Sequence, residues 1–469
     1  MRQQSPTQLR QDEFDWIRAA KRALDESFAG GRTRDRKWRE AQLSAMARML
    51  REREQEFLDA LRQDLNKPEF EAWTAEVGAS AGDAAYARKR LARWMRSRHV
   101  RTPAFGLPGK SWVQPEPLGT VLIIGAWNYP LQLILTPLAA ALAAGNCAVV
   151  KPSELAPATS SALARRIPDY LDSDAVRVIE GAVPETTALL EERWDHILYT
   201  GGGQVGRIVM AAAARQLTPV TLELGGKSPC IVLPDARLET TARRIAWGKF
   251  MNAGQTCIAP DYILTDAETE ARLVPLLRQC IEDMYGKSPR ESGSYARIVN
   301  QRHAQRLVAL LESGSTVIGG EHDVGERYIA PTVLTGVTAD DAVMNEEVFG
   351  PILPVVRTGN LESAISFIRS RDKPLSAYLF TTSRDAESRF LQQVSAGNIC
   401  INDVMMFHMV PELPFGGVGQ SGMGCYSGEH GFRTFSHFKA VMRRGLWPDL
   451  RLRYAPYTEK AVALIKRLK

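Results

Sequence analysis

The sequence has few cysteines and no pattern that would pair them. Its six cysteines, among 469 residues, stand far apart, without a Cys-x-x-Cys pair or a cluster with histidine. Zinc sites and disulfide frameworks depend on such spacings, so we expect neither, and no bound metal. Residues 1–15 contain Asp12 and Glu13 but no apolar stretch typical of a signal or transit peptide. We therefore expect a cytoplasmic protein.

A large excess of one charge is also missing from most of the chain. The formal net charge is +6, but the stretch Arg443 to Lys469 has eight Lys or Arg and two Asp or Glu, which is +6 by itself. Subtracting it leaves 51 residues of each sign in the rest of the chain. We expect no nucleic-acid partner and a basic C-terminal tail over residues 446–469. Weak contact of this tail with an anionic membrane surface is the alternative.

No uninterrupted apolar run is long enough to cross a membrane. The stretch Pro117 to Val150 has no charged residue, yet polar residues, prolines and a glycine interrupt it at Asn128, Pro130, Gln132, Pro137, Gly145 and Asn146. A transmembrane helix needs about 20 consecutive apolar residues. The pattern instead predicts a buried strand over 119–125, a loop over 127–130, a helix over 131–144 and a strand over 148–150. We expect no transmembrane segment.

Internal repeats and low-complexity tracts are absent, and the patterns predict an α/β protein. Residues 14–98 have helical spacing, with breaks near 30–31 and 66–68, and the prolines in 102–117 predict a crossing or hairpin segment. Strands over 176–179 and 196–199 alternate with helices over 187–192 and 207–214, which predicts a parallel doubly wound sheet. A second α/β unit follows, with strands over 228–233, 262–264 and 376–380 and helices over 238–252, 267–284, 301–313 and 361–370.

The stretch Asn252 to Pro260 places one thiol, that of Cys257, among small and polar residues. A buried cysteine is more often a structural residue than a nucleophile. The neighbours Asn252, Gly254 and Gln255 are poor core residues, however, and their amides and backbone can serve a polar site. We therefore take Cys257 as a candidate nucleophile.

A glycine-rich turn provides a candidate cofactor site. Gly201 to Gly206 matches GxGxxG between a predicted strand and a predicted helix, where backbone amides bind pyrophosphate. The acidic residue of that fingerprint would be Glu223, yet Glu223 could equally face a reaction centre. Lys151 and Glu154, just after a predicted strand, are an alternative site for a ribose diol. The residues alone leave these alternatives open.

Several segments together resemble the aldehyde dehydrogenase superfamily. They are GAWNYP (125–130), GNCAVVKPSE (145–154), YTGGGQVG (199–206), LELGGKSP (222–229), NAGQTCIAPDYIL (252–264), NEEVFGPILP (345–354) and LPFGGVGQSGMG (413–424). They occur in the order of that family and cover about Asp64 to Met442. WNYP, APDYIL and the GQSGMG end are similar to its class 3 branch, which includes enzymes for fatty and aromatic aldehydes.

The resemblance implies a role for each candidate. Cys257 would be the nucleophile, Asn128 would stabilise the oxyanion with the Cys257 N–H, and Glu223 would be the general base. Glu347 would hold the nicotinamide ribose or share the base's task. The NAD or NADP site would also include Lys151, Glu154, Gly201, Gly202, Gly206 and Phe349. Since a free thiol is mostly protonated at neutral pH, Cys257 needs a lowered pKa or a nearby base.

The substrate expected from these residues is an apolar aldehyde, either aliphatic of medium or long chain or aromatic. Tyr129, Thr256 and His408, with Met405, Met406 and Phe407, lie at or beside the positions of the family's aldehyde tunnel. Nothing in the sequence gives His408 an acid or base function. A CoA-acylating aldehyde dehydrogenase and a non-catalytic binding protein on this fold are the alternatives.

The resemblance also implies a domain plan and a homodimer. Residues 1–101 and 118–224 would form a Rossmann-type NAD(P)-binding domain, and residues 225–400 the α/β catalytic domain. Residues 102–117 and 401–445 would bridge the subunits as a small oligomerisation extension.

Overall fold

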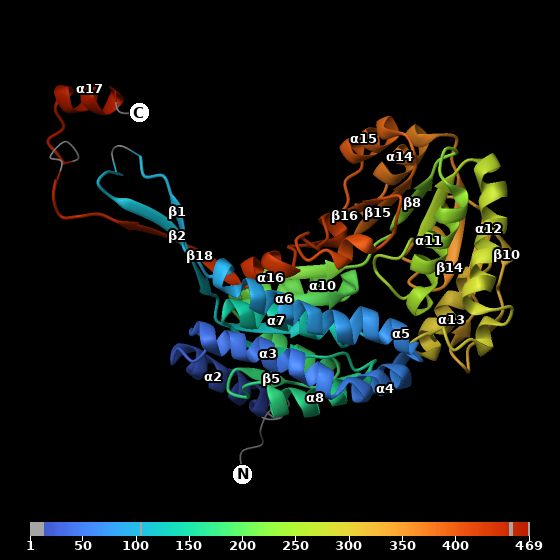
Figure 1. The fold of residues 1–469 in the computed structure, drawn as a ribbon, viewed down its shortest axis with the longest axis horizontal. Coiled ribbons are helices and arrows are strands. Elements are labelled where there is room, and N and C mark those ends of the chain that lie inside the picture. Colours follow the sequence, from blue (N-terminus) through green and yellow to red (C-terminus); the bar gives the residue numbers. More distant parts are fainter. Residues whose placement is uncertain (1–13, 104–105, 450–453, 468–469) are drawn as a thin grey trace, which may run out of the picture.

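The structure is a computed structural model that describes residues 14–103, 106–449 and 454–467. It contains two α/β units, each built on its own sheet, and a small three-stranded sheet that extends away from them (Figure 1). The predicted α/β class with a doubly wound parallel sheet is therefore confirmed.

The first sheet has six strands in the order β17-β7-β6-β3-β4-β5. Their bounds are Thr120–Ile124 (β3), Cys147–Lys151 (β4), Val176–Val178 (β5), His196–Gly201 (β6), Val220–Leu224 (β7) and Gly422–Met423 (β17). All pairs are parallel except β17 with β7. Because parallel strands end at the same edge, the residues after β3, β4, β6 and β7 are brought together there.

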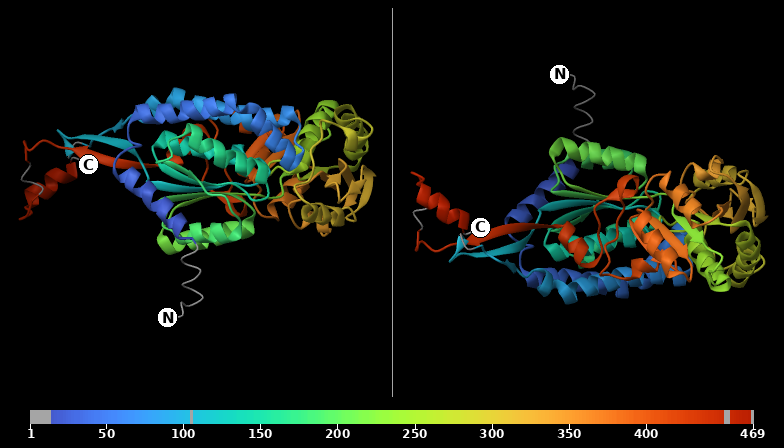
Figure 2. Two further views of the ribbon diagram at one scale, coloured as in Figure 1. Left: turned by 90° about the horizontal axis from the view of Figure 1, so that it is seen from below. Right: turned by 90° about the horizontal axis from the view of Figure 1, so that it is seen from above.

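Helices cover both faces of this sheet (Figure 2). One face packs against Asp15–Ala29 (α2), Val183–Glu191 (α9) and Gly203–Gln216 (α10), and the other against Gln132–Ala144 (α7) and Pro157–Tyr170 (α8). Arg36–Glu52 (α3) and Gly78–Trp94 (α6) pack on the outer side of α7. Alternate residues of β3 point to opposite faces of the sheet. Leu122 and Ile124 pack in the hydrophobic core with α2, α9 and α10, and Val121 and Ile123 pack in the core on the other face, with α7 and α8. A strand buried on both faces is continuously apolar.

Helix α7 explains the uncharged stretch that the sequence contains. All of its residues are buried, including the polar Gln132 and Thr136. It lies between the sheet and the outer helices α3 and α6, so it has no water-facing side. Within the described ranges, no helix combines the length and the apolar character that a membrane crossing requires.

The N-terminal helices break where the sequence predicts. Helix α2 ends before Gly30, and Glu54–Leu65 (α4) ends at the left-handed Asn66. Glu69–Ala72 (α5) then passes into a π-helical turn, Trp73–Val77 (η1), which continues as α6. Such turns are rare and are often found at functional sites.

The second sheet has seven strands in the order β10-β13-β14-β9-β8-β15-β16. The strands are Pro229–Val232 (β8), Tyr262–Thr265 (β9), Ser315–Ile318 (β10), Thr332–Val337 (β13), Ile352–Arg357 (β14), Ser376–Phe380 (β15) and Asn398–Ile401 (β16). The helices are Leu238–Phe250 (α11), Ala267–Tyr285 (α12), Gln301–Leu310 (α13), Leu361–Arg369 (α14) and Arg384–Gln393 (α15). His322–Asp323 (β11) and Tyr328–Ile329 (β12) form a short hairpin. The sequence analysis does not predict β10, β13, β14 or β16.

The predicted helices over 238–252 and 301–313 are both too long, and the second ends at Leu310 as α13. The sequence predicts a helix over 238–252, but α11 ends at Phe250 because Asn252 and Ala253 have positive φ angles of 53° and 50°. Left-handed residues other than glycine are uncommon and cluster at functional sites. They redirect the chain toward Cys257.

The projecting sheet consists of Arg98–Val100 (β1), Lys110–Pro117 (β2) and Ser436–Arg443 (β18), all antiparallel (Figure 1). The predicted hairpin segment thus contributes β2. Within 401–445, β17 belongs to the first sheet, Gly428–Thr434 (α16) packs on α6 and α7, and only β18 joins the projecting sheet. The tail 446–469, described in part, ends in Glu459–Arg467 (α17). The domain boundaries stay a prediction.

Candidate active site

A cavity of about 580 Å³ lies at the carboxyl edge of the first sheet and is also lined by the second unit. Most of the predicted site residues line it: Asn128, Tyr129, Gly201, Gly202, Glu223, Thr256, Cys257, Glu347, Phe349 and His408. They come from segments far apart in the sequence. Lys151, Glu154 and Gly206 are not among its lining residues.

The loop before Cys257 is held by its own polar groups. Gly254 has a φ of 72°, and a side chain there would collide with the backbone of Gly350. The Gln255 amide donates to the carbonyls of Asn252 (2.9 Å) and Arg297 (3.0 Å) and accepts from the Val299 N–H (2.9 Å). Gln255 therefore anchors the loop and leaves Cys257 to face the cavity.

The thiol of Cys257 lies in acidic surroundings. Burial raises its pKa, and the nearby carboxyls of Glu347 and Glu223 raise it further. The sequence analysis left two ways to activate this thiol, a lowered pKa or a nearby base. The structure favours the second, since a protonated Cys257 needs a group that takes its proton.

Asn128 is tied to the Cys257 loop from the other side of the cavity. It is buried, and its side-chain amide donates to the carbonyl of Gln255 at 3.0 Å. Its own backbone carbonyl accepts from Asn252 Nδ2 at 3.0 Å and from Lys67 Nζ at 2.9 Å. The Asn128 side chain is therefore held by a hydrogen bond to Gln255, which precedes Cys257 by two residues in the sequence.

Glu223 lies on β7 with its carboxyl group buried. Neither oxygen has a hydrogen-bond partner among the described residues. Burial alone raises the pKa of Glu223 well above its ordinary value. A carboxyl without partners in a cavity keeps its lone pairs free for a ligand, water or proton. Its position beside the cavity supports the reaction-centre alternative.

Glu347 has partners that Glu223 lacks. Its carboxyl accepts the Gly226 N–H, and a side chain on Gly225 would collide with it. Burial and the nearby Asp261 raise the pKa of Glu347 to about 8. Its loop is fastened by Lys227 Nζ, which pairs with Asp261 and donates to the Val343 and Glu346 carbonyls at 2.8 Å.

A dinucleotide fits the edge where β4 and β6 end. Gly202 caps helix α10, and a side chain there would meet open space, so its backbone is accessible. The buried hydroxyl of Thr200, which lines the cavity, has no described hydrogen-bond partner. Lys151 Nζ lies 3.1 Å from Glu154 Oε2 at the end of β4. These exposed amides and polar side chains suit a diol and a pyrophosphate.

Comparison with known proteins decides the family. The family model described as "Aldehyde dehydrogenase family" matches residues 6–441. Mouse aldehyde dehydrogenase family 3 member A2 is 47% identical over 445 residues, which is 94% of this chain and 92% of the mouse protein. The chain belongs to the aldehyde dehydrogenase family. A class 3 relative of this similarity also confirms the predicted branch.

Solved structures agree with this assignment. The substrate-bound state of Staphylococcus aureus AldH superimposes with a TM-score of 0.94 at 42% identity, covering 97% of this chain and 99% of that one. An NAD-dependent aldehyde dehydrogenase from Sinorhizobium meliloti gives 0.84 at 29% identity, covering 93% and 89%. The protein is an NAD(P)-dependent class 3 aldehyde dehydrogenase, which oxidises aldehydes to carboxylic acids.

In this aldehyde dehydrogenase, two of the predicted cofactor residues differ in environment from the rest. Gly206 lies inside α10, where a side chain would meet Leu224 at 2.8 Å, so it allows the helix to pack on β7. Phe349 lines the cavity with a φ of 46° and contacts Trp127 edge-on, with ring centroids 5.3 Å apart. Its left-handed backbone is a further strained position at the site.

The wall opposite the glutamates is mostly apolar. The hydroxyls of Tyr129 and Thr256, which line it, form a hydrogen bond to each other at 2.7 Å.

His408 also lines the cavity. Burial lowers the pKa of His408 to about 4, which keeps its ring neutral. Phe407 is not a lining residue itself but lies beside the cavity, since its ring stacks with Tyr378 and with Phe415, which lines the cavity. No cluster of three possible metal ligands occurs in the described ranges.

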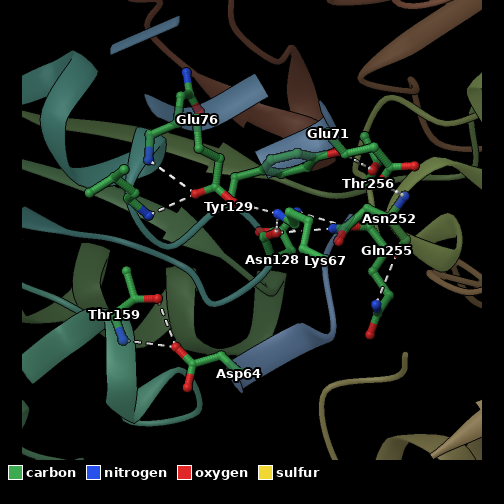
Figure 3. A network of polar contacts seen from close by, with 12 residues as sticks. Asp64, Lys67, Glu71, Glu76, Asn128, Tyr129, Thr159, Asn252, Gln255 and Thr256 are labelled. Atoms are coloured by element: carbon green, nitrogen blue, oxygen red, sulfur yellow. Dashed lines mark hydrogen bonds and ion pairs between the residues drawn. The ribbon is translucent and has the colours of Figure 1, made fainter. Parts of the chain in front are cut away.

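Sequence analysis missed a set of charged residues behind this wall. Lys67, Glu71 and Glu76 come from the segment between α4 and α6, and all contact the loops that hold Asn128 and Cys257 (Figure 3). In the sequence, the helix break near Lys67-Pro68 was the only sign that this segment is unusual. The charges gave no indication, because a charged residue that is buried has the same letter as one on the surface. Oligomeric state and cytoplasmic location stay predictions.

Proposed function

We propose that Cys257 is the nucleophile of this enzyme and that Asn128, Glu223 and Glu347 complete its reaction centre. The observation that supports this is their position on one cavity, although they come from four different loops and strands. The Cys257 sulfur attacks the aldehyde carbon while its proton passes to a nearby carboxylate, that of Glu347 or Glu223, and a thiohemiacetal forms. Loss of hydride from that carbon leaves a thioester, which water hydrolyses to the carboxylic acid.

Asn128 and the backbone N–H of Cys257 stabilise the oxyanion of the thiohemiacetal. One amide hydrogen of Asn128 is used by the Gln255 carbonyl, and the second remains for the substrate oxygen. A donor that is already in position does not have to be reoriented during the reaction. Such a donor contributes about 3 kcal/mol to transition-state stabilisation.

Glu223 activates the hydrolytic water. Its oxygens have no described partners, whereas the Glu347 carboxyl already accepts the Gly226 N–H. A base needs a free lone pair and an ionised carboxylate when the water attacks. Glu347 is better placed to orient the nicotinamide ribose.

NAD is the preferred cofactor, and when bound it accepts the hydride. Lys151 and Glu154 hold the adenosine ribose, and Gly201 and Gly202 face the pyrophosphate. The Glu154 side chain is 43% exposed and negatively charged, so it would repel the additional phosphate of NADP. Phe349 packs against the nicotinamide.

The substrates are apolar aldehydes, aliphatic of medium or long chain or aromatic. Apolar side chains dominate the cavity away from the glutamates, with Trp247, Met251, Met405, Met406 and Met409 among them. The arginine among the described lining residues, Arg306, donates to the backbone carbonyls of Glu347 and Val348, so it lies beside the glutamates and not among these apolar side chains.

An aldehyde panel tests this assignment. We expect kcat/KM to rise with chain length from short to long alkanals, to be high for benzaldehyde and cinnamaldehyde, and to be low for succinic semialdehyde. Each additional CH₂ that is buried should raise kcat/KM about fourfold. Formation of reduced cofactor is followed with NAD and with NADP, with and without CoA.

A preference for succinic semialdehyde would contradict the proposed substrate class, and a preference for NADP would contradict the role of Glu154. If reduced cofactor appears only with CoA, the thioester is passed to CoA and Glu223 is not a hydrolytic base.

A homodimer formed through the projecting sheet is the assembly we expect. Strand β18 pairs with β2 on one edge only, and its other edge has no partner strand among the described residues. An unpaired edge can pair with another chain. Sedimentation equilibrium should give twice the mass of 52.0 kDa. A monomer at micromolar concentration would contradict this.

A further inference from the structure

A buried ion pair lies directly behind the oxyanion site. Lys67 Nζ pairs with Glu76 Oε1, and both side chains have no exposed surface. Lys67 lies in the break after α4, and Glu76 in the π-helical turn η1. Two charges removed from water contribute little net stability, since desolvation offsets their attraction. This pair therefore calls for a reason other than stability.

Lys67 connects the pair to Asn128 and Tyr129. Its ammonium donates to the Asn128 carbonyl at 2.9 Å and lies 4.2 Å from the centre of the Tyr129 ring (Figure 3). Glu76 fixes the other end of this loop. Its Oε2 accepts the N–H of Leu131 at 2.9 Å and that of Gln132 at 3.4 Å. The pair thus holds the loop on both sides of Asn128.

The Cys257 loop is bound to the same network. Glu71 Oε2 accepts the N–H of the left-handed Asn252 at 2.9 Å. The Asn252 side chain then donates to the carbonyls of Asn128 (3.0 Å) and Gln255 (3.2 Å). The two donors proposed for the oxyanion therefore sit on loops that one short segment, residues 67–76, joins.

We infer that Lys67 and Glu76 are positioning residues, which act through Asn128 by holding its amide against the Cys257 loop. This rests on the proposed role of Asn128 in oxyanion stabilisation. A loop displaced by about 1 Å loses much of its effect on the transition state, while the thiol itself stays reactive. The charged pair keeps the loop in place because its hydrogen bonds reach three backbone groups of residues 128–132.

The test is the paired substitution Lys67→Met with Glu76→Gln, which removes both charges together and leaves no buried charge alone. We expect kcat for aldehyde oxidation to fall about 10- to 100-fold. Alkylation of Cys257 by iodoacetamide should keep its rate, since that reaction forms no oxyanion. The control is Arg357→Met with Glu270→Gln, a bidentate pair at 2.8 and 3.0 Å beyond the cavity, which should leave both rates unchanged.

Action through Asn128 is tested in the Asn128→Ala background. There the paired substitution should cause no further large loss of kcat. An additional loss of the same size, or an equal fall in alkylation, would overturn the inference. Wild-type activity of Asn128→Ala alone would instead contradict the proposed function, so the two failures are distinguishable.

Asn252→Gly examines the same network without disturbing the ion pair. Glycine keeps the φ of 53° and removes only the amide that joins Asn128 to Gln255. We expect a smaller fall in kcat, about 3- to 10-fold, again with unchanged alkylation and no further effect in Asn128→Ala. Unchanged kcat would overturn the proposed coupling of the loops.

Discussion

Replacing Cys257 with alanine should abolish aldehyde oxidation, with a loss of at least about 10⁴-fold in kcat. Without the sulfur there is no thiohemiacetal, and hydride would have to leave an aldehyde hydrate that the site does not hold covalently. Asn128, Glu223 and Glu347 would still line the cavity, but they would act on no bound intermediate. The measurement is the rate of formation of reduced cofactor with a long-chain aldehyde.

The matched control is Cys280→Ala, which changes a partly buried cysteine of helix α12, away from the cavity lining. It should keep wild-type kcat. Both variants should bind NAD with unchanged affinity, as followed by protein fluorescence. Full turnover by Cys257→Ala would refute covalent catalysis by this residue.

Replacing Glu223 with glutamine should separate the two halves of the reaction. We expect steady-state kcat to fall about 10²- to 10⁴-fold, because the hydrolytic water loses its base. Hydride loss does not need that base, so one equivalent of reduced cofactor per active site should still form in a rapid first phase. Stopped-flow absorbance measures both phases, and mass spectrometry should detect the acyl group on Cys257.

Glu347→Gln is the comparison that identifies the base. If Glu347 orients the ribose, its variant raises the KM for NAD and shows no accumulated thioester. A thioester that accumulates in Glu347→Gln and not in Glu223→Gln would reverse the two assignments.

The pH dependence of turnover follows from the same carboxyls. Burial raises the pKa of Glu347 to about 8 and that of Glu223 well above its ordinary value. A carboxyl acts as a base only when ionised, and a raised pKa means that this form is scarce at neutral pH. Steady-state kcat should therefore increase as pH rises from about 6 to about 9, and this increase in the slow phase should be lost in Glu223→Gln. A kcat that falls over this range would contradict a carboxylate base.

The sequence was sufficient for the features that depend on local pattern. The uncharged apolar stretch predicted β3, α7 and β4, and helical spacing predicted α2 to α6, since each of these outer helices must bury its apolar face. Motif order was sufficient for the family. Strands β13 and β14 were missed although they are longer than β3 and β4, because Gly336 in β13 and Pro354 in β14 are residues that weaken a strand pattern.

Local patterns in the sequence were enough to predict the α/β class, the family and the candidate site residues that line the cavity, because glycine turns and a polar thiol loop are local signals. The three-dimensional arrangement was needed to learn which glutamate lacks partners, that Gly206 serves packing, and that Lys67 and Glu76 lie behind Asn128. These features escape the sequence because they depend on burial. A carboxyl or ammonium has the same formula in water and in the core, and only its neighbours in space determine its pKa, its partners and its function.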